Sequence, residues 1–314
     1  MDNTTLIEQL KQRFNQQTSV NFREQGQLVA IDVENASACA SLFLQGAQIS
    51  HYQPQQQTPV LWCSEHCDYS LGRSLRGGIP ICWPWFGGLH ANPKTITEQY
   101  STRQLDDASA HGFVREQAWQ LVSVEEGEDS TTLLLQLDIP RHSQPFWPFQ
   151  TRLEYRVTIG QHLDIAFTVH NRCADKFHYS SALHSYFDIS HIDNVQLQGL
   201  DGCHYRDALD HWSTQQQRGK LAFDGEVDRI YQRQPPRLTL HDTANSDLYI
   251  DSDNSHSTVV WNPWIEKAKR LSHFDDHAYQ QMVCVETANA GLDFISLAPG
   301  ESHTLDLRLS RATC

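Results

Sequence analysis

The sequence lacks the segments that would place the protein in a membrane or outside the cell. Its 314 residues contain no run approaching eighteen uncharged apolar residues. The N-terminal segment MDNTTLIEQLKQRF is polar and lacks the apolar region of a secretory signal. There is also no run of lysine or arginine, and a net charge of −14 repels polyanions. The sequence therefore predicts a cytoplasmic protein that has neither nucleic acid nor membrane as a partner.

The sequence also lacks the common metal, nucleotide and nucleophile motifs. It has no Walker loop, GxGxxG turn or GxSxG elbow. Its eight cysteines are scattered and form no CxxC, which indicates reduced thiols. Cys63, His66 and Cys67 lie close together, but their spacing matches no common zinc pattern and a second ligand pair is missing. We expect no metal and no cofactor.

Long segments of helical periodicity are scarce, and alternation of apolar and polar residues is common. Residues 163–171, LDIAFTVHN, place apolar side chains on one face and polar ones on the other, and residues 151–160 and 302–310 behave similarly. Turn clusters separate such segments from about residue 28 to the end. This pattern predicts an all-β protein, a large and mainly antiparallel β-sandwich, because crossover helices would leave longer segments with a 3.6-residue period.

One short helix is expected at the N-terminus. Leu6, Leu10 and Phe14 recur at helical spacing behind Thr4 and Thr5, which are the candidate caps. The apolar fraction of 39 % and the charged fraction of 20 % are those of a globular protein. The composition shows no break and no repeat, so residues 1–314 are expected to form a single domain.

The stretch RSLRGGIPICWPWFG, residues 73–87, is unlike an ordinary strand. Pro80 and Pro84 cannot donate hydrogen bonds to a sheet, which predicts an edge strand or an irregular loop at the rim. Gly77 and Gly78 allow a close approach to the backbone. Two interpretations stay open for the aromatic side chains, a platform for a sugar ring or part of the core: Trp83, Trp85 and Phe86.

Two strand-like segments each present one titratable side chain. In residues 181–190, His184 shares a face with Tyr186 and Asp188, opposite an apolar face. Its ordinary pKa near neutrality suits an acid or base catalyst, although a surface or hydrogen-bonded core histidine is the alternative. Glu286 projects from the apolar segment 282–291, where a carboxylate is costly unless it is exposed, paired or catalytic.

Four further polar side chains are candidate ligand contacts. His111 and Arg115 flank a Gly-Phe turn in HGFVREQAW, and Arg76 in the stretch 73–87 offers a second guanidinium group. Arginine binds phosphate through two hydrogen bonds at once, whereas the alternative for each is an ordinary surface ion pair. Asp228 lies beside an aromatic residue in EVDRIY, and its signal alone is weak.

Taken together, the motifs resemble those of a known family. RGGIPICWPWFG, HGFVR, ALHSYFDIS, VDRIY, NPW and VETAN occur in the order seen in the hexose-6-phosphate mutarotases, the glucose-6-phosphate 1-epimerase branch of the aldose 1-epimerase family. The resemblance spans residues 25 to 310 approximately. The RGGIP block followed by HGFVR is specific to the phosphosugar branch. The segment between residues 88 and 110 varies among relatives, which leaves the choice of sugar open.

The resemblance implies a fold and a set of roles. The fold is a galactose mutarotase-like β-supersandwich whose site lies in a concave sheet. The implied substrate is a small-molecule sugar phosphate, the implied reaction is the interconversion of its α and β anomers without a cofactor, and a monomer is expected. The implied roles are those of general acid for His184, general base for Glu286, substrate-hydroxyl contact for His111 and Asp228, and phosphate clamp for Arg76 and Arg115.

Two alternatives compete with this interpretation. A glycoside hydrolase would use Asp228 and Glu286 as its two carboxylates. A non-catalytic protein could instead bind a sugar phosphate in the same pocket without turning it over. Release of reducing sugar would identify the first, and tight binding without acceleration of anomer exchange would identify the second.

Overall fold

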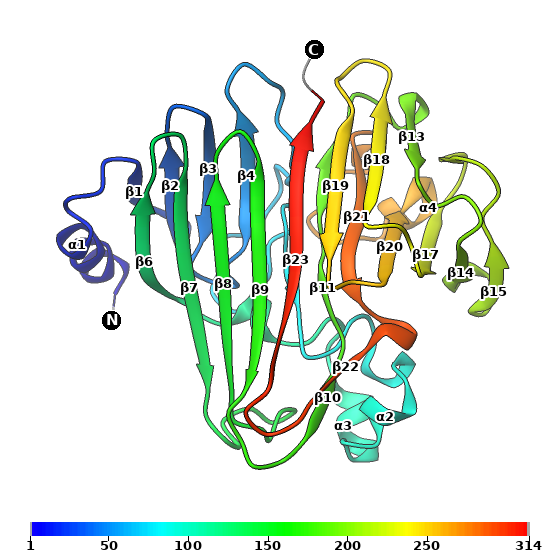
Figure 1. The fold of residues 1–314 in the computed structure, drawn as a ribbon, viewed down its shortest axis with the longest axis horizontal. Helices are drawn as coiled ribbons and strands as arrows, with labels where there is room; N and C mark the ends of the chain where they lie inside the picture. The colour runs from blue at the N-terminus through cyan, green and yellow to red at the C-terminus, as the bar shows by residue number, and fades with distance from the viewer. Residues whose placement is uncertain (1, 313–314) are drawn as a thin grey trace.

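The computed structural model describes residues 2–312, and most of them belong to antiparallel sheets. Figure 1 shows two layers: a nine-stranded sheet lies in front, and a four-stranded and an eight-stranded sheet lie side by side behind it. The strand pairings within these sheets are antiparallel. The predicted all-β fold, a large antiparallel sandwich with a short N-terminal helix, is confirmed.

Hydrogen-bonded neighbours define the order of the strands across each sheet. The four-stranded sheet consists of β1 (Val20–Gln25), β2 (Leu28–Glu34), β3 (Ala38–Phe43) and β4 (Ile49–Pro54). The nine-stranded sheet consists of β16 (Leu221–Ala222), β13 (Val195–Gln198), β18 (Arg237–Asp242), β19 (Leu248–Asp253), β23 (Ser302–Arg311), β9 (Leu163–Asn171), β8 (Thr151–Ile159), β7 (Thr131–Ile139) and β6 (Gln120–Glu126). The eight-stranded sheet consists of β15 (Ser213–Gln216), β14 (His204–Asp207), β17 (Val227–Gln232), β20 (Ser257–Asn262), β21 (Met282–Asn289), β11 (Ser181–Leu183) and β5 (Ile81–Cys82), with β12 (Tyr186–Asp188) also paired to β21. A separate ribbon pairs β10 (Phe177–Tyr179) with β22 (Ile295–Leu297).

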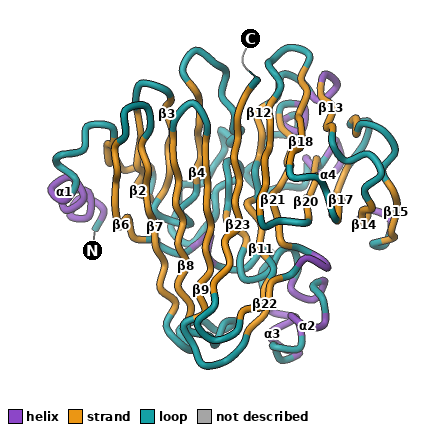
Figure 2. Tube along the Cα trace, viewed as in Figure 1, coloured by secondary structure: helices purple, strands orange, loops and turns teal. Residues whose placement is uncertain are grey.

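The helices are short. They are α1 (Asn3–Arg13), α2 (Lys94–Thr97), α3 (Thr102–Asp107) and α4 (Trp264–Ala268), with single 3₁₀ turns η1 (Leu89–Ala91), η2 (Val114–Glu116), η3 (Ile192–Asn194), η4 (Ala208–Asp210), η5 (Ala278–Gln280) and η6 (Gly291–Asp293). Figure 2 shows α1 at one edge of the molecule and α2 and α3 together at its lower end, whereas α4 overlaps the strands of the eight-stranded sheet in this view. None of the helices described between residues 2 and 312 has the length and apolarity needed to cross a membrane.

The helix α1 forms where the sequence predicts it, but its cap is a different residue. Asp2 precedes the helix and accepts a hydrogen bond from the backbone N–H of Thr5 at 2.8 Å. The prediction that Thr4 and Thr5 cap the helix is therefore wrong, because both lie inside its first turn. Leu10 is buried against β1 and β2, as the helical spacing predicts.

The core between the layers follows from the alternation of the strands. In β9, alternate residues from Leu163 to Asn171 are buried and the residues between them are partly exposed. Residues of all three large sheets meet in one apolar cluster, for example Ile31 from β2, Leu153 from β8 and Val285 from β21. Each aliphatic side chain buried in this way contributes about 1.5–3 kcal/mol to folding.

The stretch 73–87 lies at an edge, as the prolines predict. Its only regular part is β5, the last strand of the eight-stranded sheet, which pairs with β11. Trp83 and Trp85 are almost fully buried, and the ring of Trp83 packs edge-on against Trp147 with centroids 4.7 Å apart. Both tryptophans are therefore part of the core, which is one of the two interpretations given above. Phe86 is half-buried, so both interpretations stay open for this residue.

Candidate functional site

The two proposed proton-transfer residues face each other across neighbouring strands. β11 and β12 pair with the same strand, β21, in one continuous register. His184 lies between β11 and β12, and this register places it opposite Glu286. Nδ1 of His184 is 3.4 Å from Oε1 of Glu286. Glu286 is 1 % exposed and the side chain of His184 is 11 % exposed, so the pair is well shielded from water.

A short break in the sheet positions His184. The sequence predicts one strand over residues 181–190, whereas the structure has two, separated by His184 and Ser185. The backbone N–H of His184 donates to the carbonyl oxygen of Pro80 at 3.0 Å, and that of Ser185 donates to Leu183 at 2.9 Å. The stretch 73–87 thereby holds the backbone of the histidine in place.

The alternation of β21 decides which side chains reach the site. Val283 and Val285 point into the core shared with the nine-stranded sheet. Cys284 and Glu286 therefore point to the opposite face, as the sequence predicts. The surroundings of Glu286 on that face are mainly small or apolar, including Val259 on β20, its partner in the register.

Aromatic rings hold the imidazole of His184. The ring of Tyr186 stacks on it with centroids 4.7 Å apart and planes inclined by 8°. Tyr186 in turn stacks on Trp62 at 5.9 Å, and the ring of His111 lies edge-on to His184 at 5.5 Å. The sequence places Tyr186 on the same face as His184, but it gives no reason to expect the stacking.

His111 occupies a turn that fixes its ring. Its φ of 66° is in the left-handed region, and its ring Nδ1 accepts a hydrogen bond from the backbone N–H of Gly87 at 3.3 Å. Burial, followed by the charges of Arg115 and Arg76, lowers the pKa of His111 to about 3. The ring is therefore neutral, and with Nδ1 accepting, the proton is on Nε2.

Arg76 and Arg115 contribute the positive charge of the site. Nη2 of Arg115 donates to the carbonyl oxygen of Ala110 at 2.9 Å, and its Nε is buried without a partner. Nη2 of Arg76 lies 3.5 Å from the carbonyl oxygen of Ser272. Within residues 2–312 neither arginine has a carboxylate partner within 4.0 Å, whereas Arg73 pairs with an aspartate at 3.7 Å. Two guanidinium groups without counter-ions favour an anionic ligand.

Asp228 lies on β17, which is separated from β21 and Glu286 by the single strand β20. Asp228 is opposite Trp261 of β20, and Trp261 is opposite Cys284, two residues before Glu286. Nζ of Lys267 is 3.3 Å from Oδ2 of Asp228. Burial raises the pKa of Asp228, and Lys267 opposes that shift. Lys267 could not be identified from the sequence, because nothing in its local pattern in α4 links it to a strand distant in the chain.

Burial dominates the electrostatics of the central pair. It raises the pKa of Glu286 well above its ordinary value, and the charge of Asp228 acts in the same direction. It lowers the pKa of His184 well below its ordinary value, and the charges of His111, Arg115 and Arg76 add to this. The interactions thus link all six side chains predicted from the sequence, and in this structure the pair favours a protonated carboxyl and a neutral imidazole.

Three side chains of the site could hold a metal ion. The ligand atoms of His184, Cys284 and Glu286 all lie within 4.8 Å of one another. Imidazole, thiolate and carboxylate are zinc ligands. Burial, however, raises the pKa of the Cys284 thiol well above its ordinary value. The charges of Arg76 and Arg115 also oppose a cation, so the donor set does not fit a resident metal.

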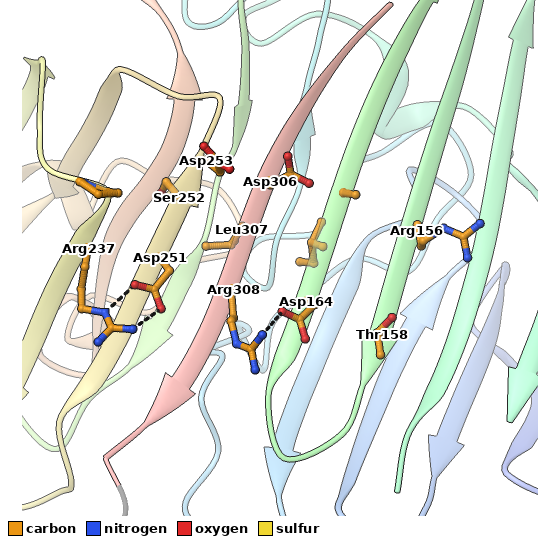
Figure 3. A pocket seen from close by; sticks show the side chains of 13 residues that line it. Arg156, Thr158, Asp164, Arg237, Asp251, Ser252, Asp253, Asp306, Leu307 and Arg308 are labelled. Atoms are coloured by element: carbon orange, nitrogen blue, oxygen red, sulfur yellow. Dashed lines mark hydrogen bonds and ion pairs between the residues drawn. The ribbon is translucent and has the colours of Figure 1, made fainter. Parts of the chain in front are cut away.

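A separate hollow on the outer face of the nine-stranded sheet has a different character. Figure 3 shows its lining, with charged side chains from β8, β9, β18, β19 and β23. Arg237 pairs with Asp251 at 2.6 Å, and Arg308 pairs with Asp164 at 3.3 Å. Cross-strand ion pairs of this kind are typical of a solvent-facing sheet, and none of the six predicted site residues lines this hollow.

Comparisons with known proteins point to one family. Residues 29–310 match the family model described as aldose 1-epimerase. A Salmonella typhimurium protein named "Putative glucose-6-phosphate 1-epimerase" is 29 % identical over 269 residues, which cover 85 % of each chain. A protein of the same name from Cenchrus ciliaris is 30 % identical over 286 residues, covering 87 % of this chain and 82 % of that one. The crystal structure of a "putative mutarotase (YeaD)" from Salmonella typhimurium superposes with a TM-score of 0.85 at 26 % identity, covering 98 % of this chain and 100 % of that one.

Proposed function

The chain belongs to the aldose 1-epimerase family, and from this premise we propose that it interconverts the α and β anomers of a hexose 6-phosphate, with glucose 6-phosphate as the substrate. The observation that most supports this proposal is the buried pair of His184 and Glu286, 3.4 Å apart, beside two arginines that have no carboxylate partner among residues 2–312. The names of the relatives from Salmonella typhimurium and Cenchrus ciliaris agree with this substrate.

In the proposed reaction, Glu286 and His184 transfer protons in opposite directions. The carboxylate of Glu286 removes the proton of the anomeric hydroxyl, and the imidazolium of His184 donates a proton to the ring oxygen. The bond between C1 and the ring oxygen breaks and leaves an aldehyde at C1. Rotation about the C1–C2 bond presents the other face of the carbonyl, and reversal of the proton transfers closes the ring as the other anomer.

The pKa shifts support this assignment. Ring opening leaves Glu286 protonated and His184 neutral, which are the forms that burial favours. A carboxylate with a raised pKa is a stronger base, and an imidazolium with a lowered pKa is a stronger acid. Burial therefore favours the same placement of the proton, on the Glu286 carboxyl group, that the open-chain state has. Before ring opening, that proton has to move from the carboxyl group to the imidazole.

The phosphate group would assist this proton movement. In the proposed complex, Arg76 and Arg115 bind the phosphate dianion, and each charge-assisted hydrogen bond contributes about 1.5–3 kcal/mol. The same two positive charges lower the pKa of His184 in this structure. A bound dianion offsets them, so the pKa of His184 rises when the substrate is in place and the imidazolium becomes easier to form.

His111 and Asp228 are proposed to contact sugar hydroxyls. The neutral ring of His111 has a proton on Nε2 and can donate it, whereas the carboxylate of Asp228 accepts. Lys267 holds the carboxylate of Asp228 in place at 3.3 Å. Contacts remote from C1 orient the substrate, and such positioning lowers the barrier without any chemistry of its own.

Exchange NMR of glucose 6-phosphate tests the function, because it measures the rate of anomer interconversion directly. Glu286→Gln keeps the shape of the side chain and removes the base, and His184→Gln removes the acid. We expect each variant to lower the exchange rate at saturating substrate by roughly 10²–10⁴-fold. The matched control is Glu154→Gln on β8, where the carboxylate accepts a hydrogen bond from Gln136 on the distant nine-stranded sheet. Exchange at the wild-type rate in Glu286→Gln would refute the proposal.

A further inference from the structure

Cys63 and Cys67 lie together directly behind the backbone of Arg76. Their Sγ atoms are 3.7 Å apart. Both sulfur atoms are also within hydrogen-bonding distance of the carbonyl oxygen of Arg76, at 3.6 Å from Cys63 and 3.3 Å from Cys67. The backbone N–H of Ser64 donates to the same oxygen at 2.9 Å. The carbonyl oxygen of one proposed phosphate-binding residue thus accepts from the Ser64 amide and lies in contact with both sulfur atoms.

The packing around this contact is tight. Cys63 forms a β-bridge with Gly77, the residue after Arg76. A Cβ atom on Gly77 would lie 2.5 Å from the Cα atom of Cys63, so there is no free space between the two segments. A movement of Cys63 or Cys67 is therefore transmitted to the backbone of residues 76 and 77.

We propose that Cys63 and Cys67 form a reversible intramolecular disulfide that weakens phosphate binding through Arg76. The inference rests on the phosphate-binding role proposed above. The sulfur atoms must approach from 3.7 Å to a bond length of about 2.05 Å. A disulfide has no S–H group, so the carbonyl oxygen of Arg76 would lose its thiol donor while the loop that presents its side chain shifts.

The oxidant is a low-molecular-weight disulfide such as oxidised glutathione. The thiolate of Cys67 attacks one sulfur of this disulfide, which gives a mixed disulfide and releases one small thiol. The thiolate of Cys63 then attacks Sγ of Cys67, closes the protein disulfide and releases the second small thiol. The two protein thiols are oxidised, the small disulfide is reduced, and the two protons end on the released thiols.

The surroundings of the two cysteines suit this order of events. The hydrogen bond from the Cys63 thiol lowers the pKa of Cys67, which makes Cys67 the attacking thiolate. The hydrogen bond to Cys67 and burial raise the pKa of Cys63. Cys67 is partly exposed and directly follows the exposed residues Glu65 and His66, which leaves its sulfur within reach of a small disulfide. Cys63, the second thiol to react, lines the neighbouring hollow of about 650 Å³.

The test equilibrates the purified protein in glutathione buffers of increasing oxidised fraction. Intact mass and peptide mapping should show the loss of two hydrogens and a peptide linking Cys63 to Cys67. Exchange NMR should show the KM for glucose 6-phosphate rising about tenfold or more, as expected for one lost charge-assisted hydrogen bond. The kcat should change little, and dithiothreitol should restore the KM.

Matched variants separate this pair from the other thiols. Cys63→Ser and Cys67→Ser should keep the wild-type KM in reducing buffer and lose the response to oxidised glutathione. Cys173→Ser, at another partly buried thiol, should keep the response. The proposal is overturned if no linked peptide forms, or if the peptide forms and the KM is unchanged. Absence of anomer exchange in the fully reduced wild-type protein would instead overturn the proposed function, because the mass measurement does not depend on activity.

Discussion

Arg73 and Arg76 are three residues apart in one loop, and their surroundings differ. Arg73 is exposed and pairs with Asp68 at 3.7 Å. Arg76 is half-buried, and its charge acts on His184 and His111. Of these two arginines, the resemblance implies a phosphate contact for Arg76 only, and that role stays a prediction.

We predict that Arg76→Ala raises the KM for glucose 6-phosphate at least tenfold, because a charge-assisted hydrogen bond to phosphate contributes about 1.5–3 kcal/mol. The KM for free glucose should change far less, since glucose has no phosphate to bind. Arg73→Ala is the matched control and should leave both values near those of the wild type. Exchange NMR with both sugars measures the two constants, and equal losses for both sugars would exclude a phosphate contact by Arg76.

The turn at Gly112 joins two parts of the site. It follows His111, and its backbone lies against Trp83 at the end of β5. Gly112 has a φ of 69°, and a Cβ atom there would lie 1.9 Å from the carbonyl oxygen of Trp83. Gly219 has the same φ of 69°, and nothing lies within 4 Å of a Cβ atom on it. The two glycines separate the effect of backbone conformation from the effect of crowding.

We predict that Gly112→Ala destabilises the protein more than Gly219→Ala does. Both substitutions place alanine in the left-handed region, at a cost of about 1–2 kcal/mol. Gly112→Ala also forces Trp83 away, which adds about 1–3 kcal/mol. Urea unfolding followed by tryptophan fluorescence measures the difference in the free energy of unfolding. Equal values for the two variants would show that the turn yields without disturbing Trp83.

The elements show how far the sequence alone determines the site. Alternation within β21 and the 181–190 segment correctly predicts which side chains share a face, because a side-chain period of two follows from strand geometry. The break between β11 and β12 could not be predicted, because it depends on the carbonyl oxygen of Pro80, about a hundred residues away. The pairing of Lys267 with Asp228 depends on tertiary structure in the same way.

The residue types in the stretch 73–87 predict its backbone conformation but not the role of its aromatic side chains. The glycines and prolines of residues 73–87 predict an irregular edge, and the structure has one. The sequence of this stretch does not distinguish a sugar platform from core packing for Trp83, because an aromatic side chain suits both. That choice depends on Trp147, which packs against it from a different part of the chain.

At the scale of the whole molecule, the sandwich provides a rigid support for a site on the face of one sheet turned away from the main core. Alternate side chains of β21 contribute to the main core and to the site. The geometry of the candidate site therefore depends on the packing of both layers. A net charge of −14 repels a sugar phosphate at long range, so the proposed binding would depend on the local arrangement of Arg76 and Arg115.

The shared core also bears on how the chain unfolds. The three large sheets contribute to one apolar cluster, so none of them can leave without exposing the others. We therefore predict that residues 1–314 unfold in one cooperative transition, in which the calorimetric and van't Hoff enthalpies agree.

Ile31→Ala in the four-stranded sheet and Leu153→Ala in the nine-stranded sheet should each lower the free energy of unfolding by about 2–5 kcal/mol and shift the whole transition to lower temperature. Leu71→Ala, at a residue 67 % exposed, is the control and should leave it unchanged. A second calorimetric transition, or a shift of only part of the heat absorption in Ile31→Ala, would show that the four-stranded sheet folds as a separate unit.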